Sequence, residues 1–269
     1  MPESRITEAF VRARKGGRTA LAPFVTVGYP TVHLSVEVVK AVVAAGADVV
    51  ELGVPFSDPL AEGPTIQKSS FHALSQGVTP ATCIDAARRL RSAGVKVPLV
   101  LMGYYNPILS YGPARFCSDA AGAGVDGLIV ADLPTEESGP LRGTARDHGL
   151  DLVPLLALTS TEARVAAACE GAAGFVYCVS VLGVTGARAV MSARVRGLVG
   201  MVRRHTQLPV AVGFGISTAA HVIDAGEFAD GAAVGSALID TIGAGLAEGA
   251  PARARAFITE LGRGTARKA

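Results

Sequence analysis

Eight short apolar runs rich in Val, Ile and Leu recur along the chain, each followed by a loop and a stretch with helical periodicity. The runs occupy residues 21–27, 48–54, 98–104, 127–133, 152–158, 175–181, 209–215 and 231–238. Strands that are apolar on both faces are typical of a parallel sheet covered by helices. Eight repeats of strand and helix favour closure into a barrel over an open sheet. We therefore predict an α/β fold, a single (β/α)8 TIM barrel.

The start of the chain predicts one further element. Residues 6–14 form an amphipathic segment with Phe10 and Val11 on its apolar side, which we expect to be an extra N-terminal helix covering the bottom of the barrel. No proline- or serine-rich linker interrupts the pattern, and barrels of about 250 residues fold as one unit. We therefore expect residues 1–269 to form a single TIM-barrel domain.

Charge, hydropathy and cysteine content narrow the function classes. The formal net charge is only +2, which argues against a nucleic-acid-binding surface. The first residues lack the apolar run of a signal peptide, and no 18-residue stretch is free of charged or turn residues, so we expect a cytoplasmic protein without membrane contact. The cysteines lie far apart, which disfavours a disulfide framework and a zinc site. They are Cys83, Cys117, Cys169 and Cys178.

Glycine-bearing loops follow the last three predicted strands, at residues 183–186, 213–217 and 235–236. Glycines let backbone N–H groups approach an anion, and a helix N-terminus carries about half a positive charge. Singly, each loop is equally typical of a tight turn, and Ser236 of a helix cap. Because all three belong to one rim of the barrel, together they predict a phosphate site made of main-chain amides.

Glu51 interrupts the second apolar run. If Val50 and Leu52 face the helices, alternation turns Glu51 into the barrel, among hydrocarbon. Burial disfavours a charged carboxyl, so we expect its pKa to be raised toward neutrality, which suits a general acid and base. The alternative is a core carboxyl hydrogen-bonded to a hydroxyl such as that of Tyr104 or Tyr177.

The loop after this strand, stiffened by prolines at 55, 59 and 64, is predicted to be neither helix nor strand throughout. It can hold a second carboxylate over the barrel mouth. Asp58 and Glu62 are the candidates; either is equally typical of a solvated loop charge, and for Asp58 we favour a structural turn. We expect Glu62, on a solvated loop, to stay ionised.

Residues 51–67 resemble the α subunits of tryptophan synthase, whose loop has the pattern ELGxPFSDPxADGPxIQ. The same family is resembled by residues 23–28, 104–107, 130–134, 183–186 and 213–217, so the likeness spans essentially the whole chain. It implies cleavage of indole-3-glycerol phosphate to indole and glyceraldehyde 3-phosphate, with no cofactor and no metal. It also implies a partner, the pyridoxal-phosphate-dependent β subunit, in an α2β2 heterotetramer, with the loops after the second and sixth strands facing that partner.

The resemblance also assigns roles to residues of this sequence. Glu51 would act as acid and base on the indole ring carbon and the side-chain hydroxyl, with Glu62 and Tyr177 as the other catalytic residues. The implied substrate-binding residues are Phe24, Tyr104, Ile129, Leu155 and Phe214, together with Thr185, Gly186, Gly215, Gly235 and Ser236 at the phosphate. Taken singly, each of the apolar residues is more often an ordinary residue of the hydrophobic core than a substrate contact.

Three competing functions stay open at the level of the sequence. Another phosphate-binding barrel enzyme, such as a sugar-phosphate isomerase or ribulose-phosphate epimerase, would need a lysine on the first strand or metal-binding His and Asp at strand ends. The histidines are all predicted in helices or helix-flanking loops; they are His33, His72, His148, His205 and His221. The second competing function is that of a weakly active regulatory subunit, and the third is that of a free-standing, indole-releasing lyase.

Glu62 is the one departure, because the family pattern has an aspartate there. That aspartate is implied to accept the indole N–H, and the longer Glu62 can do so only if the backbone retreats by about one methylene. Because misplacement by about 1 Å can cost roughly a hundredfold in rate, we expect activity below the family norm. The Glu62→Asp variant should therefore release indole faster than the wild type in a steady-state assay. Slower turnover would contradict this interpretation.

Overall fold

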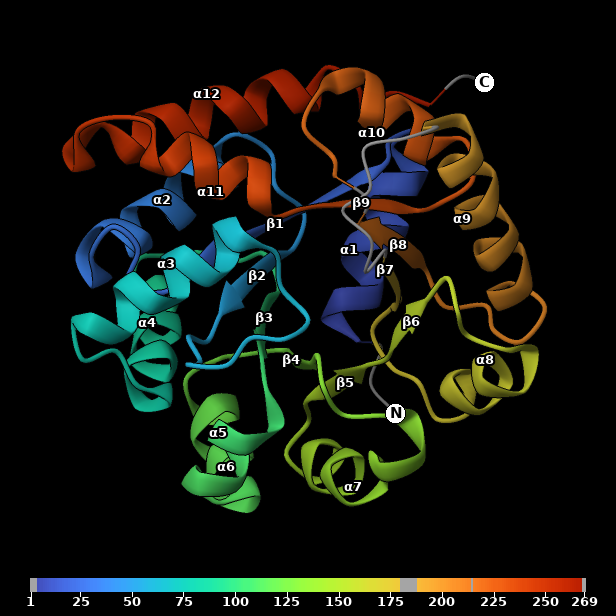
Figure 1. Cartoon of the computed structure of the whole chain (residues 1–269), viewed down its shortest axis with the longest axis horizontal. Helices are drawn as coiled ribbons and strands as arrows, with labels where there is room; N and C mark the ends of the chain where they lie inside the picture. The colour runs from blue at the N-terminus through green and yellow to red at the C-terminus, as the bar shows by residue number, and fades with distance from the viewer. Residues whose placement is uncertain (1–3, 180–187, 214, 268–269) are drawn as a thin grey trace.

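The computed structural model describes residues 4–179, 188–213 and 215–267. Its strands form one parallel sheet in the order β5-β4-β3-β2-β1-β9-β8-β7-β6, ringed by helices (Figure 1). The strands are β1 Ala20–Thr26, β2 Val50–Gly53, β3 Leu99–Gly103, β4 Gly127–Val130, β5 Asp151–Val153, β6 Leu155–Ala157, β7 Val176–Val179, β8 Val210–Gly213 and β9 Gly231–Val234. The predicted α/β barrel is confirmed.

The predicted fifth strand is divided in two at Pro154. The part before it, β5, pairs with β4, and the part after it, β6, pairs with β7. Proline has no N–H to donate to a neighbouring strand, so the ladder is interrupted there, while the Pro154 carbonyl still accepts from the Tyr177 N–H at 3.0 Å. The two ends of the sheet are thus joined by one residue, and within the described ranges the expectation of eight strands is corrected to nine.

Each of the eight predicted strand regions is followed by one or two helices. The helices are α1 Arg5–Lys15, α2 Val32–Ala44, α3 Pro64–Ser75, α4 Pro80–Ser92, α5 Tyr105–Tyr111, α6 Pro113–Gly122, α7 Gly139–Asp147, α8 Glu162–Cys169, α9 Arg188–Val202, α10 Ala219–Gly226, α11 Ser236–Gly243 and α12 Ala250–Gly262, with short 3-10 turns η1 Thr135–Glu137 and η2 Ala247–Gly249. Within the described ranges, none of these helices has an apolar stretch long enough to cross a membrane.

The last apolar run, residues 231–238, was expected to be all strand, but β9 ends at Val234. Ser236 begins α11, and Leu238, Ile239 and Ile242 form the buried side of that helix. A short apolar run fits a buried strand or a buried helix face equally well. Periodicity alone therefore placed the end of this strand too far along the chain.

The core has two layers. The larger cluster lies between sheet and helices and includes Val50 and Leu52. The smaller cluster fills the barrel and takes alternate residues of the strands, among them Ala22, Val100 and Ile129. The period of two along each strand therefore separates the barrel interior from the layer under the helices.

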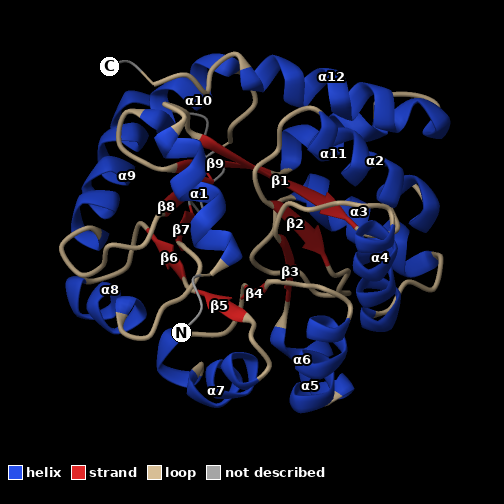
Figure 2. Ribbon diagram, turned by 180° about the vertical axis from the view of Figure 1, so that it is seen from behind, coloured by secondary structure: helices blue, strands red, loops and turns tan. Residues whose placement is uncertain are grey.

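Helix α1 closes the N-terminal end of the barrel, as the reverse view shows (Figure 2). Its buried residues are Ile6, Ala9, Phe10 and Ala13, so the prediction is correct for Phe10, whereas Val11 is only half-buried. Phe10 lies against Phe175 at 5.0 Å between ring centroids. A Cβ on Gly231, the first residue of β9, would collide with the Phe10 ring, so glycine makes room for this helix.

Three aspartates fasten the same end of the barrel. Each precedes a strand and accepts an N–H at the start of a neighbouring strand: Asp48 from Leu21 at 3.0 Å, Asp126 from Leu99 at 2.8 Å and Asp230 from Val210 at 2.9 Å. Each also pairs with an arginine, respectively Arg18, Arg91 and Arg203. These charge-assisted hydrogen bonds fix the strand ends opposite the barrel mouth.

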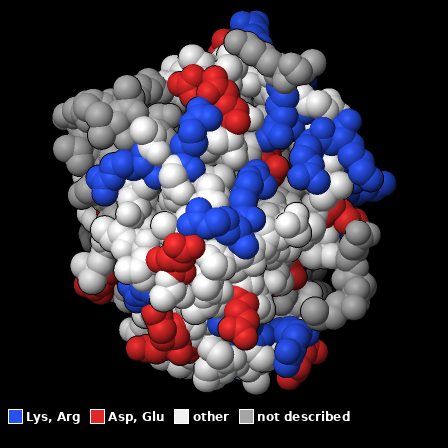
Figure 3. All heavy atoms as spheres, turned by 90° about the vertical axis from the view of Figure 1, so that its right-hand side faces the viewer, with Lys and Arg blue, Asp and Glu red and all other residues white. Residues whose placement is uncertain are grey.

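Basic and acidic side chains are interspersed on the face that carries α8 and α9 (Figure 3). Arg204 pairs with Glu162 at 2.8 Å, and Arg196 with Glu227 at 2.7 Å. The arginines of this face are therefore partly neutralised by carboxylates, which is unlike the single-sign surface that binds nucleic acid.

Gly231→Ala should destabilise the protein by about 1–3 kcal/mol, because the added methyl overpacks the contact with Phe10. Urea unfolding measures this difference. The matched control is Gly200→Ala on the exposed side of α9, where a Cβ meets nothing within 4 Å. Alanine there should be neutral or stabilise by up to about 1 kcal/mol. Equal effects of the two variants would contradict the role assigned to Gly231.

Candidate active site

Glu51 lies inside the barrel, near the C-terminal ends of the strands. It is the second residue of β2, flanked by Val50 and Leu52, which belong to the outer layer. Its side chain is 1% exposed, and among the described residues its Oε1 atom has no hydrogen-bond partner. The predicted orientation is correct. The alternative of a structurally satisfied core carboxyl finds no support at this oxygen.

Burial raises the pKa of Glu51 to about 8, and the nearby charge of Glu62 acts in the same direction. The main cause is that removing a carboxylate from water disfavours the charged form. Near neutral pH the group is therefore largely protonated but can still give up its proton. This is the property that a group needs in order to act first as acid and then as base.

Two aromatic rings lie across glycines at the mouth of the barrel. A Cβ on Gly53 would collide with the ring of Phe24, and a Cβ on Gly213 would lie 2.7 Å from the Tyr177 hydroxyl oxygen. Both rings are almost fully buried. Burial raises the pKa of Tyr177 well above its usual value, with smaller contributions from Glu51 and Glu62, so its hydroxyl stays protonated.

The other predicted apolar residues border the same interior. Ile129 is fully buried in the barrel cluster. Leu155 is half-buried, packs against that cluster, and is the register partner of Tyr177. Phe214 lies outside the described residues. The barrel thus offers hydrocarbon walls beside the Glu51 carboxyl.

Glu62 is half-buried rather than solvated, which corrects the expectation from the sequence. Burial raises its pKa, and its charge in turn raises the pKa values of Glu51 and Tyr177. The loop that carries it, residues 54–63, contains neither helix nor strand, as predicted. Its second carboxylate, Asp58, is exposed and accepts from the Ser57 hydroxyl at 2.5 Å. Of the two candidates, the structure brings only Glu62 to the barrel mouth.

Tyr104 immediately follows β3 and is 5% exposed. Its hydroxyl accepts a hydrogen bond from the backbone N–H of Ala61 at 3.0 Å, immediately before Glu62. The sequence assigned Tyr104 to the substrate, whereas the contact described by the structure is with the loop after β2.

Two of the three glycine-bearing loops lie side by side. Strands β8 and β9 are paired with Ala211 opposite Gly231, so Gly215 and Gly235 follow them at matching positions. Gly215 has a φ of +59°, which favours glycine, and Ser236 begins α11. Backbone N–H groups at a helix N-terminus suit an anion. Thr185 and Gly186, in the third loop, lie outside the described residues.

His221 is a residue that sequence reasoning missed at this rim. It lies on α10, as predicted, but its Nδ1 atom is 3.1 Å from the Ser217 backbone nitrogen and 3.2 Å from the Gly215 carbonyl oxygen. A helical histidine therefore reaches back to the loop after β8. The spacing of four residues between Ser217 and His221 was the only signal in the sequence.

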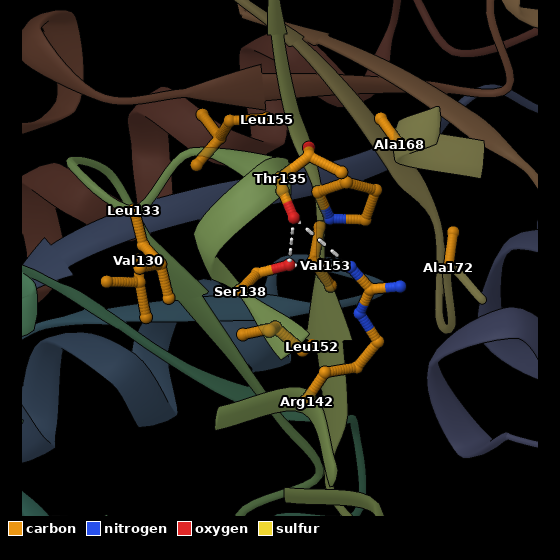
Figure 4. Close-up of a pocket in the computed structure, with 11 residues that line it drawn as sticks. Val130, Leu133, Thr135, Ser138, Arg142, Leu152, Val153, Leu155, Ala168 and Ala172 are labelled. Carbon is orange, nitrogen blue, oxygen red and sulfur yellow. Dashed lines mark hydrogen bonds between the residues drawn. The ribbon is translucent and has the colours of Figure 1, made fainter. Parts of the chain in front are cut away.

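A separate hollow lies beside the division of the fifth strand, between β4–β6 and the helical segments η1, α7 and α8 (Figure 4). Arg142 borders it and donates to the Ser138 hydroxyl at 2.6 Å and to the Glu170 carbonyl at 2.8 Å. Glu51 and Glu62 do not line it. These contacts tie α7 to α8, and Leu155 borders both this hollow and the barrel interior beside Tyr177.

A parallel barrel with a buried carboxyl, a second carboxyl and a helix N-terminus at the C-terminal ends of its strands has the arrangement of a TIM-barrel enzyme that uses acid–base catalysis. The family model of the tryptophan synthase alpha chain matches residues 10–264. The chain belongs to the tryptophan synthase alpha chain family, and it is a lyase of the alpha type.

Individual relatives agree over nearly the full length. The tryptophan synthase alpha chain of Chloroflexus aggregans is 49% identical over 264 residues, covering 98% of this chain and 99% of that one. A solved structure of Mycobacterium tuberculosis tryptophan synthase has a TM-score of 0.90 at 38% identity and covers 99% of this chain and 100% of its own. The alpha chain structure from Legionella pneumophila has a TM-score of 0.86 at 33% identity, covering 96% and 95% of the two chains.

Glu51→Gln should stabilise the protein increasingly as the pH rises. The pKa of Glu51 is raised from 4.5 to about 8, so between these values the unfolded chain ionises at this residue while the folded chain holds the proton. The unfolded state then binds fewer protons, and stability falls as pH rises. The advantage of the variant should grow by about 3 kcal/mol between about pH 5 and pH 8.5.

Urea unfolding at several pH values measures this advantage. Glu248→Gln, which removes an exposed carboxyl, serves as the control and should follow the wild-type curve. A Glu51→Gln curve that runs parallel to the wild type over the whole range would show that Glu51 titrates normally.

Proposed function

We propose that this chain cleaves indole-3-glycerol phosphate to indole and glyceraldehyde 3-phosphate, as the α subunit of tryptophan synthase. The observation that carries the proposal is the buried Glu51 carboxyl, whose pKa is about 8 and whose Oε1 atom finds no partner among the described residues, beside Glu62 at the barrel mouth. Membership of the tryptophan synthase alpha chain family supports the same reaction.

The reaction breaks the bond between the indole ring carbon and the glycerol side chain. Protonated Glu51 gives its proton to the ring carbon, which leaves a positive charge on the ring. The Glu62 carboxylate accepts the indole N–H and stabilises that charge. Glu51, now a carboxylate, takes the side-chain hydroxyl proton as the carbonyl forms and the bonding electron pair returns to the ring. The proton given to carbon equals the one taken from oxygen, so the reaction balances without an added reactant.

The barrel supplies the other requirements of this step. Phe24, Ile129, Leu155 and Phe214 are proposed to wall the indole ring, and Tyr177 to assist Glu51. A hydrocarbon lining excludes water and strengthens each electrostatic interaction with the charged ring. The barrel walls would hold the indole ring, whereas the second carboxyl is carried by a loop, which can lie over a bound substrate.

The phosphate is proposed to bind the main-chain amides of Gly186, Gly215, Gly235 and Ser236, with Thr185 in the same loop as Gly186. The matching positions of Gly215 and Gly235 after paired strands support this assignment. Holding the phosphate at β8 and β9 orients the glycerol chain toward β2, because β1 alone separates β9 from β2 in the sheet. Positioning of this kind contributes a large part of the rate in such enzymes.

A β subunit that depends on pyridoxal phosphate is the proposed partner, in an α2β2 heterotetramer. Leu60, on the loop that carries Glu62, is 91% exposed, and Leu109 on α5 is 49% exposed. Large apolar side chains exposed beside a functional opening are typical of interaction surfaces. A cytoplasmic location is part of the same proposal, since all four cysteines are buried free thiols, as in proteins of a reducing compartment.

Purified wild-type chain should release indole from indole-3-glycerol phosphate, and adding a tryptophan synthase β subunit should raise the rate. Glu51→Gln should lower the turnover number by about 10²–10⁴-fold with little change in substrate binding, because it removes the acid and base but keeps the side-chain shape. Glu248→Gln should match the wild type.

The same assay separates the competing functions. A full rate that does not respond to the β subunit would identify a free-standing lyase. Absence of indole release, combined with stimulation of the β subunit, would identify a regulatory subunit and contradict the proposed reaction.

A further inference from the structure

The loop that carries Glu62 is held by its backbone on both sides of that residue. The Ala61 N–H donates to the Tyr104 hydroxyl oxygen at 3.0 Å. The Glu62 carbonyl accepts from the Gln67 Nε2 group at 2.9 Å, and the Glu62 N–H donates to the Pro59 carbonyl at 3.0 Å. The main chain of Glu62 is therefore fixed independently of its side chain.

Tyr104 is suited to hold this loop because it is itself held. Its ring is 5% exposed and stacks on Phe56 at 5.2 Å between centroids, at an interplanar angle of 29°. The preceding Gly103 lies against Val54, where a Cβ would come within 3.1 Å of Val54 Cβ. The end of β3 thus contacts the loop near its start, at Val54 and Phe56, and again at Ala61.

The Tyr104 hydroxyl works as an acceptor, not as an acid or base. Burial, with the charge of Glu62 as a further cause, raises the pKa of Tyr104 well above its usual value, so the group stays protonated at physiological pH. A neutral hydroxyl accepting from an amide sets a distance and a direction. Its contribution therefore reaches the reaction through the position of the loop.

We infer that Tyr104 is a positioning residue for Glu62: its hydroxyl, together with the Gln67 amide, sets where the Glu62 carboxylate meets the substrate. The inference deepens the proposed function and rests on it. It differs from the substrate contact that the resemblance implied for Tyr104. The role matters in this chain because the glutamate side chain is one methylene longer than aspartate, so its reach depends on the backbone position of residues 61–62.

The test is a double-mutant cycle measured by indole release. Tyr104→Phe removes the acceptor and keeps the ring, and it should lower the turnover number about tenfold, in the range of one hydrogen bond, with KM changed less than about twofold. In a Glu62→Gln background the same substitution should have an effect of less than about twofold. A merely structural role of Tyr104 would act equally in both backgrounds.

The matched control is Tyr111→Phe, which removes the hydroxyl that donates to Asp119 at 2.8 Å on the helices outside the barrel. This variant should keep wild-type turnover. If Tyr111→Phe and the wild type are both active but Tyr104→Phe is also unchanged, the inference fails while the proposed function stands. If the wild type releases no indole, the proposed function fails first.

Two further outcomes overturn the inference. A rise in KM with an unchanged turnover number would assign Tyr104 to substrate binding. Equal losses in the wild-type and Glu62→Gln backgrounds would assign it to general stability. If Tyr104→Phe does not fold, Gln67→Ala removes the second anchor from an exposed position. It should show the same dependence on Glu62, and additive losses would contradict the inference.

Discussion

The desolvation of one carboxyl, that of Glu51, governs the organisation of this protein. An ionised carboxylate inside hydrocarbon is strongly disfavoured, and the group responds by holding its proton to a pKa of about 8. The raised pKa lowers the free energy of unfolding at high pH, but it also makes the carboxyl an acid of useful strength at neutral pH. Within the described part of the chain, its Oε1 atom has no hydrogen-bond partner. The free-energy cost of burying the carboxyl is therefore not relieved by a hydrogen bond at this oxygen.

The rest of the barrel holds this carboxyl in place and closes the barrel to water at its N-terminal end. Helix α1 closes the N-terminal end with Phe10 and Phe175, and aspartates fix strand ends there through N–H groups and arginines. At the opposite end Gly53 and Gly213 admit the rings of Phe24 and Tyr177 beside the opening. The stabilising contacts are thus concentrated at one end of the barrel and the candidate catalytic groups at the other, a division typical of this fold.

Local patterns in the sequence were sufficient to predict the barrel and the inward orientation of Glu51. The alternation of Val50, Glu51 and Leu52 predicted that the carboxyl points inward, and the N-terminal helix α1 was also predicted.

The division at Pro154 was missed because each half of that segment pairs with a different neighbour, which no local pattern encodes. The environment of Glu62 was misjudged since it depends on Tyr104 and Gln67, which anchor the loop from β3 and α3. His221 was overlooked for a different reason: its contact is local, with the loop just before its own helix, but its position on a helix directed attention away from the strand end.

The central claim is that the Glu51 carboxyl exchanges its proton near neutral pH. The most direct measurement is a titration of glutamate side-chain carboxyl carbons by ¹³C NMR, with the Glu51→Gln variant identifying the resonance. We predict a midpoint near pH 8 for this carbon. A midpoint close to the usual glutamate value of about 4.3 would contradict the account.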